Sequence, residues 1–311
     1  MWGLSTVSCE SMAELYPRLV EFVDRWGEPF KPRNLPCKEV RPGIFHLSSA
    51  ELGLYSGASR RLNYRFWAVE TLQYMAGHGG DRKHAELLIA VNSEMKKFVN
   101  PVTGTFDGAY GPRLAHSLGD IHALLKRDPD SRQAVATIWS PGLPAPSLDV
   151  PCTLSMQFLK GSQGLSLVVN MRSNDIKLGL PYDVAAFCAI QCTMASLLNM
   201  QVGTYTHIAG SLHSYDNNPV QLAHIGQERW VDVEIPQLRI PPELPNLWTW
   251  EQVKVGAGQI LDDLLSHIIV SGIAGMNVNH WRNFYSPLEA EHTFWRKWCN
   301  LIRWNWKERL R

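Results

Sequence analysis

The chain has 311 residues, of which 45% are hydrophobic and 19% are charged, the balance of an ordinary globular protein. Its formal net charge is +1, which excludes nucleic-acid binding driven by a positive charge spread over the whole surface. The longest apolar runs are too short to span a bilayer, and the N-terminal stretch lacks the pattern of a secretory signal. The six cysteines form no C-x-x-C pair, so we expect a reducing, cytoplasmic location.

The first half of the chain alternates helical patterns with loops. Apolar residues at helical spacing predict helices over 11–27 and 65–77, and a helix in 118–133 that ends in a loop before Pro129. The second of these ends in a glycine, as a helix stop should, and carries Glu70 among large apolar residues. Residues 30–60 are rich in proline and glycine, which predicts short strands and loops.

The second half contains the clearest strands. Residues 134–140 have a strand pattern, and 153–173 predict two strands joined by a turn that contains glycine. A buried helix is predicted over 183–200, with Asp183 at its N-cap, and a further strand over 203–218. Strands and helices mix without a strict βαβ rhythm, so the α+β class is favoured over a doubly wound α/β fold.

Several reactive residue types have more than one interpretation. Cys152 lies between a proline-containing loop and a strand, and it would need cationic neighbours such as Arg172 or Arg132 to become reactive. His207 and His213 are six residues apart on one predicted strand, so they would share a face, but no third metal ligand has suitable spacing. We therefore expect no metal site.

The stretch from Arg172 to Asp175 turns abruptly polar after a predicted strand, and Asp183 follows shortly after. Buried ionisable groups are costly unless they are paired, so this stretch is either a surface loop or a site for a charged ligand. The C-terminal part has its own open question, because its tryptophans accompany several basic residues (Trp295, Trp298, Trp304 and Trp306). Such a helix can bind a membrane surface, but packing on its own domain is the expected interpretation.

Seven short motifs, in order along the chain, resemble the thymidylate synthase family and within it the pyrimidine-nucleotide hydroxymethylases. They are "PRN" (32–34), "SRRLNYRFWAVETL" (59–72), "GAYGPRL" (108–114), "DPDSRQ" (128–133), "DVPCT" (149–153), "MRSNDIKLGLPYDV" (171–184) and "GSLHSY" (210–215). Residues 1–29 and 221–311 are outside this resemblance.

The resemblance implies a nucleotide site. Arg172 and Ser173 match the residues that hold the 5′-phosphate, because an arginine fork suits phosphate oxygens. The other substrate-binding residues implied are Arg33, Arg132 from the partner subunit of a homodimer, Asn174, Asp183, His213 and Tyr215, the last two at the sugar hydroxyl. The family usually has a second arginine after Arg132, and here it is Gln133.

The resemblance also implies a cosubstrate and a mechanism. The cosubstrate would be 5,10-methylenetetrahydrofolate, bound through Asp175, Gly179 and the basic pair Arg60 and Arg61. Cys152 would be the nucleophile that adds to C6 of the pyrimidine, and C5 would then attack the one-carbon unit. Glu70 matches the carboxylate that orders water and moves protons, and Tyr110 a tyrosine near the C5 proton.

Two departures from thymidylate synthases bear on the substrate and the product. Where they have asparagine, this chain has Asp183, and a carboxylate can only accept hydrogen bonds, which fits the amino group of cytosine. An alternative is that Asp183 only caps its helix. Asp149 replaces an apolar residue three positions before Cys152, and Thr153 replaces a histidine, as in phage deoxycytidylate hydroxymethylases. A polar Asp149 would admit the water that makes a hydroxymethyl product.

The sequence thus predicts an α+β, thymidylate synthase-like fold with a large mixed sheet, packed sheet to sheet in a homodimer. We expect one catalytic domain over 1–311, with its core at about 30–235 and a Pro- and Trp-rich segment of the same domain at 236–311. The predicted reaction gives 5-hydroxymethyl-dCMP, with neither nucleic acid nor a membrane as partner. The alternatives are CMP as substrate, a thymidylate synthase or uridylate hydroxymethylase acting on dUMP, and a binding homologue without turnover.

Overall fold

A computed structural model describes residues 6–140, 147, 149–216, 229–240, 248–271 and 281–303. The chain forms two compact units, each assembled from three stretches. The first unit comprises Met1–Leu62, Leu124–Trp139 and Cys152–Ile235, and the second comprises Asn63–Ala123, Ser140–Pro151 and Pro236–Arg311.

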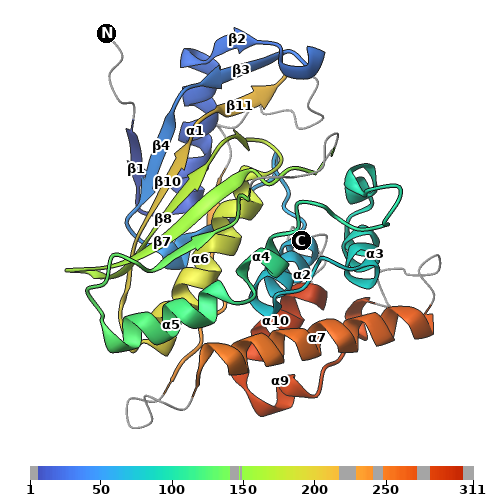
Figure 1. Ribbon diagram of the computed structural model, residues 1–311. Helices are drawn as coiled ribbons and strands as arrows, with labels where there is room; N and C mark the ends of the chain where they lie inside the picture. The colour runs from blue at the N-terminus through green and yellow to red at the C-terminus, as the bar shows by residue number, and fades with distance from the viewer. Residues whose placement is uncertain are drawn as a thin grey trace. The chain divides into compact units, whose positions relative to one another are not determined.

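A six-stranded mixed sheet forms the centre of the first unit (Figure 1). Its strands, in spatial order, are β1 (Thr6–Cys9), β4 (Gly43–Leu47), β10 (Val202–Ala209), β8 (Gly164–Met171), β7 (Thr153–Gly161) and β6 (Val135–Thr137). Buried and half-exposed residues alternate along β8 and β10, as expected of strands with one covered face. Helix α6 (Leu180–Leu197) packs on these two strands, and its residues are apolar and buried nearly all round.

A four-stranded sheet completes the part of the first unit that positions the candidate site. Its order is β2 (Glu28–Phe30), β3 (Cys37–Val40), β11 (Leu212–Tyr215) and β9 (Asn174–Asp175). Strand β9 begins three residues after the end of β8, and β11 begins three residues after the end of β10. Because β8 and β10 are parallel neighbours, the segments that follow them enter the second sheet side by side. There they form β9 and β11, which again pair in parallel.

Smaller elements close the first unit. They are α1 (Met12–Trp26), the short 3-10 helices η1 (Pro32–Asn34) and η2 (Ala50–Leu52), and the paired strands β5 (Leu54–Ser56) and β12 (Val231–Val233). Helix α1 begins after Ser11, whose hydroxyl accepts a hydrogen bond from the backbone N–H of Glu14 at 3.3 Å. Its apolar side packs against β1, β3 and β5.

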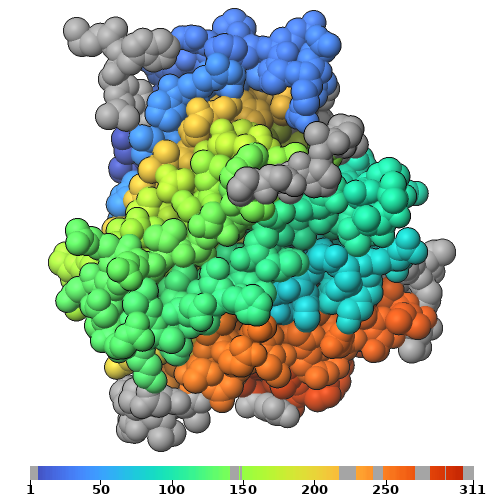
Figure 2. All heavy atoms as spheres, in the orientation of Figure 1, coloured from blue at the N-terminus to red at the C-terminus, as the bar shows by residue number. Residues whose placement is uncertain are grey.

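The second unit is mainly helical. Its elements are α2 (Tyr64–Ala76), α3 (Arg82–Val91), η3 (Ser93–Phe98), α4 (Tyr110–Leu114), α7 (Trp250–Ser271), α9 (Leu288–Glu291) and α10 (Thr293–Arg303), while α5 (Ser117–Arg127) runs from one unit into the other along the chain. Helix α2 lies at the centre of this unit's packing, because it contacts α3, α4, α7 and α10. The outer side of α7 is exposed, in orange in Figure 2, and carries Val255 and Ile269.

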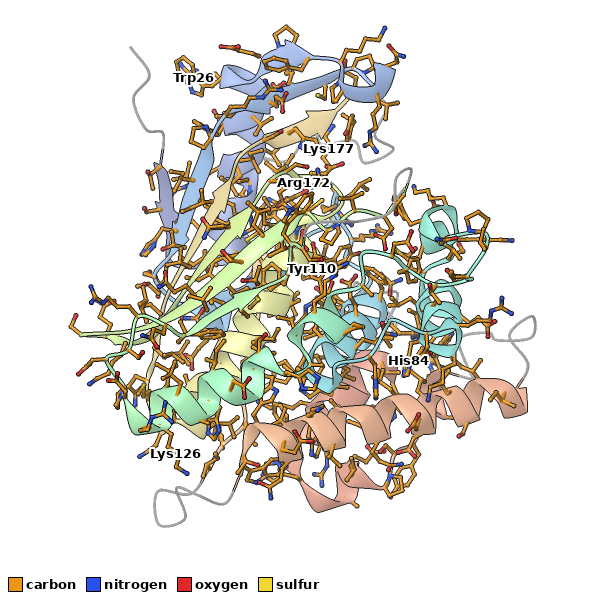
Figure 3. The ribbon with its side chains drawn as sticks, viewed as in Figure 1. Trp26, His84, Tyr110, Lys126, Arg172 and Lys177 are labelled. Atoms are coloured by element: carbon orange, nitrogen blue, oxygen red, sulfur yellow. The ribbon has the colours of Figure 1, made fainter. Side chains whose placement is uncertain are left out.

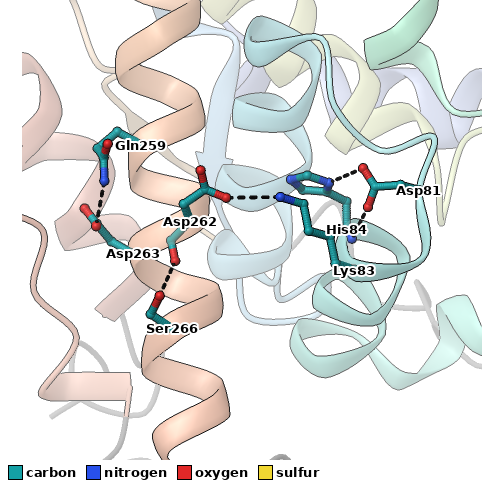
Figure 4. Close-up of polar contacts among 7 residues, drawn as sticks. All are labelled: Asp81, Lys83, His84, Gln259, Asp262, Asp263 and Ser266. Carbon is teal, nitrogen blue, oxygen red and sulfur yellow. Dashed lines mark hydrogen bonds and ion pairs between the residues drawn. The ribbon is translucent and has the colours of Figure 1, made fainter.

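Polar contacts connect α3 to α7 within the second unit (Figure 4). Asp81 caps α3, accepting from the backbone N–H of His84 at 3.1 Å, and its other carboxylate oxygen lies 2.7 Å from His84 Nδ1. Lys83, in the first turn of α3, forms an ion pair with Asp262 of α7, 3.3 Å from Nζ to Oδ1. Asp81 pairs with His84 and Lys83 pairs with Asp262, so we interpret these contacts as structural.

The predicted α+β class with a large mixed sheet is confirmed, and so are the helices at α1 and α2 and the two strands β7 and β8. The tail prediction holds for the described part, because α10 packs on α2 with Trp298 against Trp67, ring centroids 5.3 Å apart. Trp304 and Trp306 lie outside the described residues. Cys188 and Cys192 are fully buried core thiols, and α6, although long and apolar enough to cross a bilayer, is 83% buried as a core helix.

Two sequence predictions were wrong in detail, and a third was right. Helix α6 begins at Leu180 and not at Asp183, so Asp183 lies in the first turn and the N-cap is Gly179. The expected end of the third helix before Pro129 is confirmed, because α5 ends at Arg127. The predicted strand 203–218 is two strands in different sheets, so His207 and His213 do not share a face.

Candidate active site

Cys152 and Arg172 meet at one end of the six-stranded sheet. Cys152 immediately precedes β7 and Arg172 immediately follows β8, and the antiparallel register places Thr153 opposite Met171. The Arg172 backbone N–H donates to the Cys152 carbonyl at 2.8 Å, and its Nη2 donates to Cys152 Sγ at 3.7 Å. Arg172, labelled in Figure 3, is exposed and Cys152 is half-buried, so both are open to a ligand. A guanidinium beside a thiol favours the thiolate, which is the nucleophilic form.

Trp139 is a neighbour of this pair that the sequence reasoning missed. The Arg172 guanidinium lies over the Trp139 ring at 5.8 Å from its centroid. The ring is held there because Trp139 follows β6 and its backbone N–H donates to the Leu154 carbonyl at 3.2 Å. Only the register of β6 against β7 brings Trp139 to Arg172, and periodicity alone does not encode a register.

The polar stretch after β8 folds back towards the start of α6. Asn174 Nδ2 donates to Asp183 Oδ2 at 2.7 Å, so the carboxylate is engaged by a side chain and does not cap the helix. Burial raises the pKa of Asp183 to about 7, and the hydrogen bond from Asn174 opposes that rise. Gly179 lies beside this pair, where an added Cβ would be 3.3 Å from Asp183 Oδ2. A side chain at position 179 would therefore crowd the Asn174–Asp183 pair.

His213, Tyr215 and Arg33 form a second polar group. The rings of His213 and Tyr215 meet edge to face at 4.9 Å, and the Tyr215 hydroxyl accepts from Arg33 Nη2 at 3.4 Å. Arg33 is exposed and its backbone is left-handed (φ 49°), a conformation uncommon for a residue with a side chain. The pairing of β9 with β11 puts His213 opposite Asp175, so this group and the polar stretch share one sheet.

The residues predicted to bind the cosubstrate divide into a buried and an accessible set. Asp175 is half-exposed, and its Oδ1 accepts from the backbone N–H groups of Lys177 and Leu178 at 2.8 and 3.2 Å. Arg60 is only 7% exposed, and its guanidinium donates to the carbonyls of the same loop. Arg61 is exposed. Arg60 thus shapes the loop from within, while Arg61 has the exposure that an anionic ligand needs.

Ser173 and Arg132 occupy different surroundings in the first unit. Ser173 is half-buried between Arg172 and Asn174, where its hydroxyl can serve the same ligand. Arg132 and Gln133 are exposed in the loop before β6, which Gln157 holds by donating to the Arg132 carbonyl at 2.9 Å. The role of Arg132 in a partner subunit stays a prediction.

Three predicted catalytic residues belong to the second unit. Glu70 is half-buried on α2, and Tyr110 begins α4 with its ring stacked on Tyr74 at 5.2 Å (Figure 3). Asp149 accepts from the backbone N–H of Gly108 at 2.7 Å. Burial raises the pKa of Asp149, and the nearby Asp107 acts in the same direction. Their roles stay predictions.

A sequence model of thymidylate synthase matches residues 94–258, which include Cys152, Arg172, Asp183 and His213. The chain belongs to the thymidylate synthase family. It is 30% identical over 229 residues to a deoxyuridylate hydroxymethyltransferase of Bacillus phage SP01, an alignment that covers 68% of this chain and 58% of that protein.

A second relative in the thymidylate synthase family is the thymidylate synthase of Aster yellows witches'-broom phytoplasma (strain AYWB). The identity is 26% over 170 residues, covering 50% of this chain and 58% of the relative. The chain thus spans 58% of the length of each of these curated relatives. The resemblance found in the motifs is confirmed at the level of the family.

Proposed function

We propose that this protein transfers a one-carbon unit from 5,10-methylenetetrahydrofolate to C5 of a cytosine nucleotide and adds water, giving 5-hydroxymethyl-dCMP from dCMP. The observation that carries the proposal is the Arg172–Cys152 contact, 3.7 Å from Nη2 to Sγ, in a chain of the thymidylate synthase family. It joins a nucleophile to a cation that both favours the thiolate and suits a phosphate.

The covalent steps use groups of this chain. The Cys152 thiolate adds to C6 of the pyrimidine, which makes C5 nucleophilic towards the one-carbon unit. Once that unit is attached, removal of the C5 proton expels tetrahydrofolate and leaves an exocyclic methylene group on the pyrimidine. Water adds to this group, the thiolate leaves C6, and tetrahydrofolate is the second product. Glu70 and Tyr110 are proposed to move the protons and Asp149 to admit the water.

The nucleotide would bind through exposed cations and half-buried hydroxyls. Arg172 and Ser173 follow directly on each other and suit phosphate oxygens, and Arg33 adds a further exposed guanidinium. His213 and Tyr215 meet at 4.9 Å, a pair suited to a sugar hydroxyl. Arg132 is proposed to reach the phosphate of a partner subunit, which sedimentation analysis of the oligomeric state would test.

Asp183 supports the choice of base. An ionised carboxylate only accepts hydrogen bonds, and cytosine presents an amino group where uracil presents a carbonyl. A buried polar edge left unpaired costs about 1–3 kcal/mol, which corresponds to roughly ten- to a hundredfold in selectivity. Because Asn174 occupies only one hydrogen bond of this carboxylate in the contacts described, an amino group has acceptor sites left.

The residues present fit a folate cosubstrate. Asp175 uses Oδ1 for the backbone of its own loop, so Oδ2 can accept N–H groups of a pterin ring, and exposed Arg61 suits a glutamate tail. Gly179 lies in the same loop, and a Cβ there would come within 3.9 Å of the Asp175 carbonyl, so the small residue suits the proposed folate site. The cosubstrate would supply the one-carbon unit at the formaldehyde oxidation level.

A second candidate is hydroxymethylation of dUMP. The phage SP01 relative is a deoxyuridylate hydroxymethyltransferase. Since the pKa of Asp183 is raised to about 7, a protonated carboxyl could donate to the uracil carbonyl near neutral pH. Both candidates use the same nucleophile and differ only in the base.

Tritium release from C5-labelled dCMP, CMP and dUMP, with 5,10-methylenetetrahydrofolate present and the product mass measured, tests the proposal. We expect release from dCMP and a product heavier by a hydroxymethyl group. A hydroxymethyl product from CMP alone would change the sugar, and one from dUMP alone would favour the second candidate. A methyl product from dUMP would make the protein a thymidylate synthase. No release from any of them would mean a binding homologue, with Gln133→Arg as the first variant to make.

A further inference from the structure

Asn174 and Asp183 form a pair at the junction of β9 and α6. Asn174 is 2% exposed, and its Nδ2 donates to Asp183 Oδ2 at 2.7 Å. The other end of the same amide, Oδ1, is buried, and no described residue donates to it. A buried acceptor without a donor destabilises a fold, so this Oδ1 marks a place where a ligand group can supply the missing hydrogen bond.

Two opposing influences set the protonation of Asp183. Burial raises its pKa to about 7, while the hydrogen bond from Asn174 favours the charged form. Tyr205 on β10 is a described titratable group that interacts with this carboxyl, and burial raises its own pKa, so it is neutral. Its hydroxyl lies 2.8 Å from Nδ1 of His207, which is also neutral because burial lowers its pKa to about 3. Among these described groups, Asn174 is therefore the one that supports the charge on Asp183.

We propose that Asn174 is a positioning residue that holds Asp183 as a charged acceptor. The protonation state of the Asp183 carboxyl then decides which base is bound. With the carboxyl ionised, it accepts from the 4-amino group of a cytosine nucleotide. With the carboxyl protonated, it donates to the 4-carbonyl oxygen of a uracil nucleotide. The inference rests on the proposed function for the identity of the ligands, but it concerns binding and needs no turnover.

The hydrogen-bond geometry explains why Asn174 matters in both states. Its Nδ2 donates to Asp183 Oδ2 and so leaves the other carboxylate oxygen for a ligand. Removing the donor frees the carboxyl to rotate and removes the interaction that favours its charge. The pH at which cytosine is preferred should then rise.

The test is calorimetric binding of dCMP and dUMP between about pH 5.5 and about pH 9, a range that brackets this titration. In the wild-type protein we expect the affinity ratio of dCMP to dUMP to rise with pH through about 7, by roughly ten- to a hundredfold. Asn174→Val removes the donor at similar size, and we expect its midpoint to lie about one pH unit higher. Asn170→Val is the matched control, because Asn170 lies on β8 and donates to Ser155 instead.

A double variant isolates the mechanism. In an Asp183→Asn background nothing titrates at this position, so Asn174→Val should no longer move any midpoint. A ratio independent of pH in the wild type, or an unmoved midpoint in Asn174→Val, would overturn the inference. Absence of binding by either nucleotide would overturn it together with the proposed function. A ratio that changes with pH without tritium release would uphold the inference and reject only the proposed reaction.

Discussion

Asp183 and Asp149 are both carboxylates with raised pKa values, one in each compact unit, but their surroundings differ. Asp149 lies in a loop network, where it accepts from the Gly108 N–H while Arg113 nearby partly compensates its charge. Asp183 has one hydrogen bond among the described contacts, and that bond comes from Asn174, which itself has an unpaired acceptor.

The hydrogen-bond partners of Asp149 come from the protein. Asp183 has acceptor sites that a ligand would have to fill. A loop network such as that of Asp149 can hold a charge without a substrate, because donors and a cation are already in place. The Asp183 site tolerates its charge poorly until a ligand supplies donors. We therefore assign the choice of base to Asp183 and expect Asp149 to act on the course of the reaction.

The largest expected effect tests whether the first unit, which holds Asp183, contains a reacting site at all. Cys152→Ser should lower C5 tritium release by at least about a thousandfold, because a serine hydroxyl ionises far less readily than a thiol. The half-buried position and similar size predict a free energy of unfolding within about 1 kcal/mol of the wild type. Cys9→Ala is a control with another free cysteine of the first unit. Retention of activity in Cys152→Ser would remove the basis of the mechanism.

Asp183→Asn should change the base preference by roughly a hundredfold, away from dCMP and towards dUMP, since an amide can donate to a carbonyl oxygen. It should also stabilise the protein at alkaline pH. Asp183 has a folded-state pKa of about 7, above its ordinary 3.8, so its destabilising effect is absent below about pH 4 and complete above pH 7. Denaturation at about pH 4 and at about pH 8 should show a gain of up to about 4 kcal/mol only at the higher pH. An equal gain at both pH values would contradict this account.

Arg172→Lys keeps the charge but loses the planar fork and its contact with Cys152. We expect about a tenfold higher KM for the nucleotide, with a smaller fall in kcat, because a charged hydrogen bond contributes about 1.5–3 kcal/mol and lysine recovers part of it. Steady-state kinetics with dCMP measure both values. An unchanged KM would place the phosphate elsewhere.

The smallest effect belongs to the Asp149 loop. Asp149→Asn retains an acceptor for the Gly108 N–H, so we expect the unfolding free energy to change by less than about 1 kcal/mol. If Asp149 acts on the added water, the rate of hydroxymethyl formation should fall by less than about tenfold while the dCMP to dUMP preference stays unchanged. A changed base preference would erase the distinction between the two carboxylates.

Much of the local structure follows from the sequence because it depends on neighbouring residues. The helix over Tyr64–Ala76 follows from its periodicity and from Gly77, which takes the left-handed conformation (φ 74°) that a helix end favours. The strands β7 and β8 follow from their pattern and from the turn between them. The motifs identify the family, although they do not determine the base.

The limits of sequence reasoning are visible at two sites. The sequence pattern misplaces the start of α6. Leu180 and Pro181 belong to the helix without a capping side chain before them, whereas Asp183 has the residue type of an N-cap. The residues 203–218 read as one strand, since a change of sheet at Gly210 has no signature in a pattern of period two.

The sequence by itself determined the α+β class, the family and the set of polar residues at the candidate site. Only the tertiary structure decided how they pair: Arg172 with Cys152 through the register of β7 and β8, and Asn174 with Asp183 through the crossing from β8 to β9. The physical reason is that a residue's type is local, whereas strand register, burial and the pKa of a carboxylate depend on segments that are distant along the chain.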